Sequence, residues 1–412
     1  MDNVPDLQEQ LWTEIASYAP VRGSSLPPSD ALHQAFMRYP RHEFVERFKF
    51  PGEHFMPPVE RGTTEFLPGG YQNRPLMYVK DDGSLYEASS SEPAFIFHLA
   101  QLLNAQDGQS VLEIGCGTGW LVAVLSHLVG ARGTVVGVEI QSGLARQAAR
   151  NIKRFGIENA EIIEGNAFEN VGQRKFDRVI VTASMYDIPS AVIDILQEGG
   201  LAILPIRSRG LPEEVHLLRK VGSCLTSETT RLCKFVAMVD PDGTTEDHFQ
   251  PLDRNATYRA HCADANIERE LTFDGASPKE MLWRALPFTS YLAKVDAGFR
   301  QFVVGRIGTT ITSHPIFGDP SWTAFGLAYD REESLAVWHA GRVTRYGAPT
   351  AFQSFLKHYD DWCAVGKPSG FAFGLAITAN GSAPHGGVAG RFREDRADVS
   401  LWWHLRPQEE RL

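Results

Sequence analysis

The sequence predicts an α/β fold: a mostly parallel, doubly wound sheet with helices on both faces, followed by an α+β domain. The first observation is that short apolar runs alternate with longer amphipathic runs between about residues 110 and 206, a pattern typical of parallel sheets. The second is a glycine-rich turn at residues 115–119, between the first apolar run and the amphipathic run that follows it. The third is that the alternation of strand and helix patterns ends at about residue 207, after which strand-like runs follow one another directly.

The composition is that of an ordinary soluble globular protein, and 412 residues are enough for two domains. No apolar run has the length of a membrane span, and the N-terminus lacks the order of a signal peptide, so we expect a cytoplasmic protein without a membrane partner. The net charge of −10 argues against a nucleic-acid partner. The five cysteines are scattered and the thirteen histidines lack metal-ligand spacing, so we expect reduced thiols and no metal.

Residues 1–85 are expected to form a helical and loop segment that leads into the sheet. Ala31 to Tyr39 carries apolar residues at helical spacing, whereas residues 50–85 are rich in Gly, Pro and other turn formers and predict loops. A helix is predicted to begin near Ser91, because a hydroxyl, an acid and a proline succeed one another at its start. Ser91 is then the predicted N-cap.

Residues 86–243 are predicted to form the sheet itself. We expect its strands at 111–115, 134–139, 160–165, 176–183 and 201–206, and its helices at 119–130, 141–155 and 188–197. A turn is expected at 198–200. Residues 213–240 predict two strands in succession, which suit an antiparallel edge of the same sheet.

Residues 244–412 are expected to form the α+β domain. Strand-like alternation occurs at 322–330, 334–347, 370–379 and 399–405, and a helix is predicted over 348–366. The aromatic residues of this region suit either peptide binding or an ordinary hydrophobic core. Their strand and helix periodicity favours the core. These aromatic residues include Trp322, Trp338, Trp362, Trp402 and Trp403.

The glycine turn and an acid downstream of it predict a nucleoside-type cofactor. Glycines leave the backbone open to a ligand. Glu139 stands about 20 positions after Gly119, where a doubly wound sheet holds a ribose by its hydroxyls. Glu113, two residues before the first glycine, would repel a pyrophosphate and suit a cationic ligand. A glycine turn without any ligand is the alternative.

The pattern E-x-G-x-G-x-G resembles the first motif of S-adenosylmethionine-dependent methyltransferases, whose ligand carries a sulfonium and an ammonium. This resemblance implies a Rossmann-like class I methyltransferase fold with S-adenosyl-L-methionine as cofactor. The residues expected to bind the cofactor are Glu113, Gly115, Cys116, Gly117, Thr118, Gly119, Glu139, Ile140, Asn166, Ala167 and Thr182.

Other segments resemble the protein L-isoaspartate O-methyltransferase family in order and spacing. They are AFMRYPRHEFVE (35–46), YQNRPLMYV (71–79), ASSSEPAFIFHLAQLL (88–103), FDRVIVTAS (176–184) and KFVAMVD (234–240), so the resemblance covers roughly residues 10 to 240. It places Ser91 at the family's active-site serine and Ser89 at the preceding threonine, and both are candidate catalytic residues. The alternative is that Ser91 only caps a helix.

Methylation of a carboxylate needs no strong base, since the acceptor is already ionised near neutral pH. The reaction needs in-line placement against the sulfonium methyl and exclusion of water. A hydroxyl beside the free N–H groups of a helix start can orient such an acceptor.

Two residues depart from the family pattern in this region. Asn166 replaces an acid at the adenine end of the cofactor, although its amide oxygen can still accept a hydrogen bond. Glu92 replaces a glutamine and adds a negative charge near the acceptor, which Arg74 or another cation would have to offset.

The extended C-terminal region departs from the family pattern most and directs the first functional hypothesis. Extended members of the family imply a carboxyl O-methyltransferase that modifies an aspartate in a ribosomally synthesised, modified peptide. In the methyl ester the methoxy group can leave, so the neighbouring backbone amide nitrogen displaces it as methanol and closes a succinimide (aspartimide), which persists or hydrolyses to isoaspartate. The C-terminal domain would then recognise the precursor peptide.

Repair of L-isoaspartyl residues in damaged proteins is the alternative hypothesis. A non-catalytic binding module that keeps the fold is a further alternative. No N-P-P-Y motif follows the fourth strand, which argues against a nucleic-acid methyltransferase. The sequence does not specify an oligomeric state.

Overall fold

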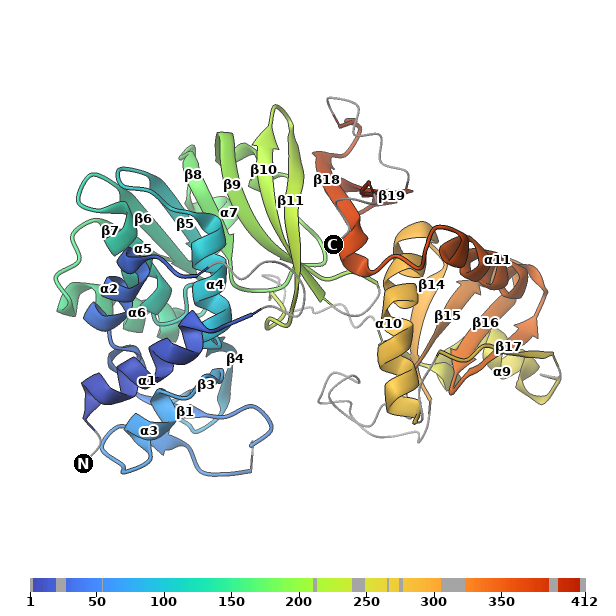
Figure 1. Ribbon diagram of the computed structural model, residues 1–412, viewed down its shortest axis with the longest axis horizontal. Coiled ribbons are helices and arrows are strands. Elements are labelled where there is room, and N and C mark those ends of the chain that lie inside the picture. The colour runs from blue at the N-terminus through green and yellow to red at the C-terminus, as the bar shows by residue number, and fades with distance from the viewer. Residues whose placement is uncertain are drawn as a thin grey trace.

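The computed structural model describes residues 3–19, 27–53, 55–209, 213–238, 249–264, 267–273, 277–304, 323–384 and 392–407. These residues form three sheets with helices packed around them (Figure 1). The largest sheet has ten strands in the order β19-β20-β18-β11-β10-β9-β8-β5-β6-β7. In Figure 1 the N-terminal helices and a small sheet lie at one end of the molecule, and a six-stranded sheet lies at the other end.

Five parallel strands form one half of the largest sheet, which confirms the predicted fold class. The strands are β5 (Ser110–Ile114), β6 (Thr134–Glu139), β7 (Ala160–Glu164), β8 (Phe176–Val181) and β9 (Leu196–Ile206). Helices α5 (Trp120–Val129) and α6 (Ser142–Arg154) connect the first three strands, close to the predicted bounds. In α6 the buried residues Leu144, Ala145, Ala148 and Ile152 recur at helical spacing, so one face of the helix packs against the sheet.

The predicted helix at 188–197 is wrong in extent. Helix α8 covers only Ala191–Asp194, and strand β9 already begins at Leu196, where it pairs with Phe176 of β8. The predicted turn at 198–200 lies within this strand, which contains Gly199 at a φ of +72°. Residues 197–200 have no partner in the ladders with β8 and β10, so the two glycines form an irregular bend within the strand.

Turns and loops dominate residues 50–85, as predicted, but helix α3 (Phe66–Gly70) and the strands β2 and β3 lie among them. Together with β1 and β4, which flank this region, the two strands form an antiparallel sheet in the order β2-β1-β3-β4, which the sequence did not predict. Its core contains Phe48, Leu76 and Tyr78, which pack with Leu144 of α6. Tertiary packing stabilises these short strands despite the many glycines and prolines. The strands are β1 (Arg47–Lys49), β2 (Val59–Glu60), β3 (Leu76–Val79) and β4 (Leu85–Ser90).

The helical prediction for the first forty residues is confirmed where the structure describes them. Helix α1 covers Val4–Ala16 and α2 covers Asp30–Arg38, followed by a 3-10 turn at Arg41–Phe44. These helices pack on α4 (Pro93–Leu103) and α5 through a core that includes Phe36.

The other half of the largest sheet combines strands from distant parts of the chain. β10 (Glu213–Val221) and β11 (Cys224–Cys233) are antiparallel, as predicted. β18 (Phe373–Ala379) then pairs with β11, and β20 (Val399–Leu405) and β19 (Phe392–Asp395) follow. How the chain divides into domains stays a prediction, but residues 373–405 extend the sheet that carries the glycine turn.

The six-stranded sheet has the order β12-β14-β15-β16-β17-β13. Helices α10 (Pro278–Val295) and α11 (Thr350–Ala364) share a core with its inner strands, and α9 (Ala256–His261) lies near β17. The strands are β12 (Phe249–Pro251), β13 (Glu268–Glu270), β14 (Phe299–Val303), β15 (Thr323–Tyr329), β16 (Ser334–His339) and β17 (Arg342–Gly347).

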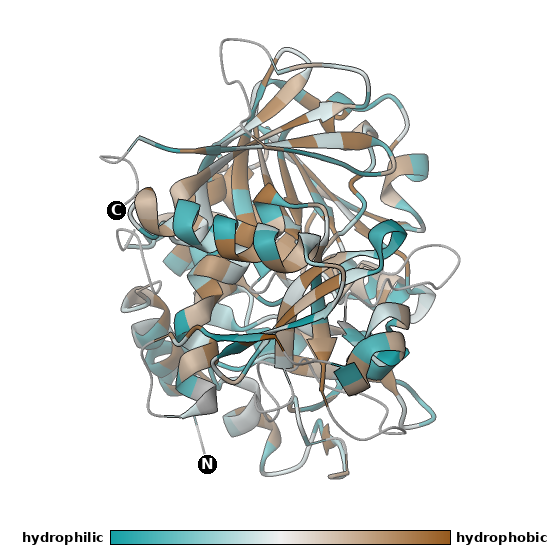
Figure 2. Cartoon of the chain, turned by 90° about the vertical axis from the view of Figure 1, so that its right-hand side faces the viewer, coloured by the Kyte–Doolittle hydropathy of each residue, from teal (hydrophilic) through white to brown (hydrophobic). Residues whose placement is uncertain are grey.

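The aromatic residues of the C-terminal region are mostly core, as their periodicity favoured. Trp338, Trp362 and Trp403 are at most 4% exposed and share one cluster with residues of the parallel strands. Trp402 is half-buried, and Trp322 lies outside the described residues. Figure 2 shows hydrophobic residues along the strands and mixed faces on the helices. None of the helices in the described part of the chain is long and apolar enough to cross a membrane.

Candidate functional site

A pocket lies at the carboxyl ends of the parallel strands, next to the point where the strand order reverses between β5 and β8. Open α/β sheets bind their ligands at such a point. Four of the lining segments follow successive parallel strands, and two more come from β4 and from residues 236–238. The lining residues that matter here are Glu87, Ser89, Gly115, Gly117, Glu139, Ile140, Asn166, Ala167, Thr182, Asp187, Pro189 and Val236.

The glycines of the turn have φ values of +86°, +54° and +84° at positions 115, 117 and 119, a region that side chains rarely adopt. A Cβ at Gly117 would lie 3.0 Å from the hydroxyl of Tyr78, and one at Gly119 would lie 3.2 Å from Cβ of Ala148. Gly115 and Gly117 line the pocket, whereas Gly119 allows α6 to pack closely. The turn therefore needs glycine both for its backbone and for its neighbours.

Two residues of the turn point away from the pocket. Cys116 is buried in the core beneath the sheet. Thr118 is fully buried, and its Oγ1 lies 3.0 Å from the Tyr78 hydroxyl. Cys116 and Thr118 belong to the predicted cofactor set but do not line the pocket. The same is true of Gly119 and Glu113.

Glu113 is 2% exposed on β5, and its Oε2 has no hydrogen-bond partner among the described residues. Burial, together with the nearby charge of Glu139, raises the pKa of Glu113 well above its ordinary value. Burial at this position therefore favours the neutral form of the carboxyl group.

Glu139, at the end of β6, lies in the pocket wall. Its Oε2 accepts from the N–H of Gly117 and its Oε1 from the N–H of Gln141, both at 2.9 Å. Burial raises the pKa of Glu139, but each oxygen keeps a further lone pair that can accept from a ribose hydroxyl. The next residue, Ile140, is 40% exposed and gives the wall an apolar face. This donor and acceptor set fits an adenosine-type cofactor.

Asn166 and Thr182 line the pocket but are engaged in local hydrogen bonds. Asn166 caps the short helix α7 (Ala167–Asn170): its Oδ1 accepts from the N–H of Phe168 at 3.1 Å, and its Nδ2 donates to Glu169. Thr182 donates to the carbonyl of Gly115 at 2.7 Å. Thr182 therefore fixes the start of the glycine turn from the neighbouring strand.

The structure separates the two candidate serines. Ser89, on β4, lines the pocket, whereas Ser91 lies directly after β4 and outside the lining residues. The prediction that Ser91 caps the helix is wrong. Glu92 is at the N-cap position of α4 and makes no side-chain cap hydrogen bond. Asn73 satisfies this helix end from another segment, since its Oδ1 accepts from the N–H of Ala94 at 2.9 Å.

Arg41 is a site residue that the sequence analysis missed, although the motif YPRHEF contains it. Its guanidinium is fully buried and donates to the Ser90 hydroxyl and to the carbonyls of Gly70, Gln72, Arg74, Ser90 and Ser91. Burial lowers the pKa of Arg41 to about 9. Arg41 thus joins the segment before β3 to the end of β4, next to the candidate serines.

The positive charge near Glu92 also comes from Arg41. Burial raises the pKa of Glu92, and the charge of Arg41 opposes this rise. Arg74, the cation expected for this role, instead pairs with Glu53 at 3.2 Å and stacks over Phe50.

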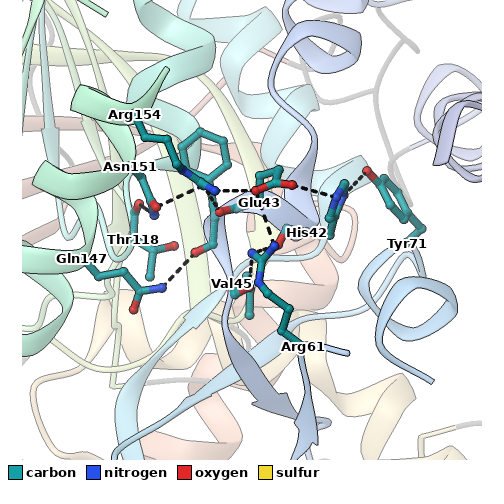
Figure 3. Close-up of polar contacts among 10 residues, drawn as sticks. His42, Glu43, Val45, Arg61, Tyr71, Thr118, Gln147, Asn151 and Arg154 are labelled. Carbon is teal, nitrogen blue, oxygen red and sulfur yellow. Dashed lines mark hydrogen bonds and ion pairs between the residues drawn. The ribbon is translucent and has the colours of Figure 1, made fainter. Parts of the chain in front are cut away.

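A polar network connects the N-terminal segment to the glycine turn (Figure 3). Glu43 pairs with Arg61 and Arg154, and Nδ1 of the adjacent His42 lies 2.7 Å from the Tyr71 hydroxyl. On α6, Asn151 accepts from Arg154 and donates to the carbonyl of Thr118 at 2.9 Å. The network therefore stabilises the turn through residues that do not line the pocket. Among the described residues, no group of three or more His, Cys, Asp or Glu side chains could hold a metal ion.

Comparisons with known sequences point to one family. A sequence model of the family described as protein-L-isoaspartate(D-aspartate) O-methyltransferase matches residues 22–243. The protein-L-isoaspartate O-methyltransferase of Thermotoga maritima is 33% identical over 180 residues, which cover 43% of this chain and 51% of that protein. The Pyrobaculum arsenaticum protein of the same name is 32% identical over 184 residues, covering 43% and 77%. A solved structure of a protein-L-isoaspartate O-methyltransferase covers 92% of this chain and 97% of its own, with a TM-score of 0.48 and 20% identity.

Proposed function

Because the chain belongs to the protein-L-isoaspartate(D-aspartate) O-methyltransferase family, we propose that it methylates L-isoaspartyl residues in damaged proteins. Its cofactor is S-adenosyl-L-methionine. The observation that carries the proposal is that the family match, residues 22–243, includes every residue that lines the pocket.

The family relatives support this repair function better than the first hypothesis of a dedicated modified peptide. That hypothesis depended on the long C-terminal region. The Thermotoga maritima relative also has about half of its length outside the match. A long additional region therefore gives no reason to prefer a precursor peptide over a damaged protein.

The residues of the pocket have distinct proposed roles in the reaction. Glu139 would accept the ribose hydroxyls, and Gly115 and Gly117 leave the backbone open to the ligand. When bound, the cofactor supplies a methyl group on a positively charged sulfur. Ser89, in the wall, would orient the acceptor carboxylate, which is already ionised and needs no base. Ser91, fixed through its carbonyl by Arg41, would direct its hydroxyl to the same acceptor.

Repair then follows from the chemistry of the ester. The adjoining backbone nitrogen attacks the methyl ester, forms the ring C–N bond and releases methanol, which leaves a succinimide. Hydrolysis of the ring gives a mixture of aspartyl and isoaspartyl peptide, and the isoaspartyl product can enter a further round. The enzyme thus has to supply only placement and exclusion of water.

Methyl incorporation from labelled S-adenosyl-L-methionine tests the proposal. Two peptides of the same sequence would be compared, one with isoaspartate and one with ordinary aspartate at a single position. We expect incorporation into the isoaspartyl peptide only. Incorporation into the aspartyl peptide alone would contradict the repair function and favour a modifying enzyme.

A further inference from the structure

The hairpin of β19 and β20 contacts the loop after β8, which lines the pocket. Asp187 and Pro189 of this loop are in the pocket wall. The N–H of Ala397 donates to Oδ1 of Asp187 at 3.2 Å, and Nη1 of Arg396 donates to the carbonyl of Tyr186. The guanidinium of Arg396 also lies 4.4 Å from the centre of the Tyr186 ring. Residues more than two hundred positions apart therefore meet at the pocket wall.

The contact is built from buried charges. The side chain of Arg396 is fully buried and that of Glu394 is 7% exposed, and Nε of Arg396 donates to Oε1 of Glu394 at 3.2 Å. Nε of Arg209 lies 3.7 Å from the same carboxylate oxygen and 3.4 Å from the Tyr186 hydroxyl. Buried charges persist only where their partners are fixed. The hairpin and the loop thus constrain each other.

The first part of the loop is fixed separately, by the backbone of the sheet. The N–H of Ser184 donates to Val236 at 2.8 Å, and that of Met185 donates to Pro205 at 3.0 Å. The hairpin contacts begin one residue later, at Tyr186. Its influence therefore falls on Tyr186 and Asp187, where the loop reaches the pocket.

The position of the loop indicates which part of the site it affects. The glycine turn, Glu139 and Asn166 follow β5, β6 and β7, whereas the loop follows β8, on the other side of β5. Most of the proposed cofactor residues therefore lie on one side of the strand reversal, whereas the loop, which begins at Thr182, lies on the other. The loop is suited to form the acceptor side of the pocket.

We propose that Arg396 and Glu394 are positioning residues that act through Tyr186 and Asp187 on the acceptor side of the site. The C-terminal region is then a structural part of the reaction site, in addition to any role in recognising a substrate. The effect on peptide kinetics rests on the proposed function, whereas the effect on the loop itself does not.

Hydrogen–deuterium exchange on the full-length protein tests the positioning without a substrate. We expect Arg396→Met to speed exchange in residues 184–189 and to leave residues 113–119 unchanged. Arg393→Met is the matched control, because Arg393 is on the same hairpin but pairs with Asp395 and stacks on Trp402. Unchanged exchange in the loop of folded Arg396→Met would overturn the inference.

Kinetics supply the second measurement. We expect Arg396→Met to lower kcat/KM for an isoaspartyl peptide by about tenfold or more, since small displacements at a reacting site have large effects. The Kd for S-adenosylhomocysteine should stay within about twofold. If Arg396→Met does not fold, Asp187→Ala serves instead, because it removes the hydrogen bond between Asp187 and Ala397 from the loop side. It should also speed exchange in residues 184–189. Wild-type protein that methylates nothing would contradict the proposed function alone, and the exchange result would still decide the inference.

Discussion

Gly117 combines a backbone that disfavours side chains with a close neighbour. Its φ is +54°, and an added Cβ would meet the Tyr78 hydroxyl at 3.0 Å. The sequence alone suggested that a side chain here would clash with the ligand. The structure shows that the first clash is with Tyr78, so the turn would move and the pocket would change with it.

We expect Gly117→Val to abolish measurable binding of S-adenosylhomocysteine in calorimetry. Gly172→Val is a suitable control, because Gly172 has a φ of +63° with nothing within 4 Å of its added Cβ and does not line the pocket. The control should bind the ligand normally despite a similar backbone strain. Normal binding by Gly117→Val would contradict the role given to the turn.

The protonation of Glu113 makes the free energy of unfolding depend on pH. Burial and the charge of Glu139 raise its folded pKa well above 4.5. Between pH 4.5 and the folded pKa, the native state binds more protons at this site than the unfolded state, so Glu113 makes stability fall as pH rises. Through this group, the free energy of unfolding falls by at most about 1.4 kcal/mol per pH unit.

Glu113→Gln should remove this slope. We expect the free energy of unfolding of the variant, relative to wild type, to increase between pH 5 and pH 7 in urea titrations. An equal difference at both pH values would show that Glu113 is ionised in the native protein.

At the scale of elements, two residues near the start of α4 have different expected roles. Asn73 is structural, and Ser91 is a candidate catalytic residue. Asn73, from the loop before β3, caps this helix, and Ser91 does not. Asn73→Ala should therefore lower the free energy of unfolding by about 1 kcal/mol. Ser91→Ala should leave stability and cofactor binding nearly unchanged.

We expect Ser91→Ala to slow methyl transfer to an isoaspartyl peptide all the same. Urea denaturation, calorimetry and initial rates of the two variants would distinguish the roles. Unchanged turnover in Ser91→Ala would remove Ser91 from the reaction and leave Ser89, in the pocket wall, as the candidate.

The elements that the sequence predicted best are those with long, regular patterns. The buried parallel strands and the helices α5 and α6 have such patterns, and their bounds were close to the prediction. The strands β1 to β4 are two to six residues long and depend on packing between Phe48, Leu76 and Leu144. A local pattern cannot indicate that kind of contact, and for the same reason Asn73 could not be predicted as the cap of α4.

At the scale of the whole molecule, the sequence could not show that β18 pairs with β11, about 150 residues away. Alternation identified both strands, but the partner of an edge strand is decided by tertiary structure. The buried ion pair between Glu214 of β10 and Lys294 of α10, at 2.9 Å, is another such contact. It connects the largest sheet to the C-terminal region at a site where both side chains are at most 2% exposed.

Removal of one partner from this pair should be costly. Burial alone would raise the pKa of Glu214, but Lys294 and His216 hold it at about 2. The stabilisation is therefore present above pH 4.5 and is lost as pH falls towards 2. We expect Lys294→Met to lower the free energy of unfolding by about 3–5 kcal/mol at pH 7.

A double variant and a surface control complete this test. Lys294→Met with Glu214→Gln should recover part of the loss, since no unpaired charge remains buried. Lys357→Met, which breaks the exposed pair with Asp361, should change stability by about 0.5 kcal/mol or less. An equally small effect of Lys294→Met would show that the pair does not hold the two parts together.

Repair of isoaspartyl residues by this protein is tested by following the fate of an isoaspartyl peptide. The peptide would be incubated with the full-length protein and excess S-adenosyl-L-methionine through many turnovers, and its isomers would be separated by chromatography. We expect the isoaspartyl peptide to disappear while ordinary aspartyl peptide accumulates, with one methanol released per turnover. An isoaspartyl peptide that persists unchanged, although the protein binds the cofactor, would rule out the repair function.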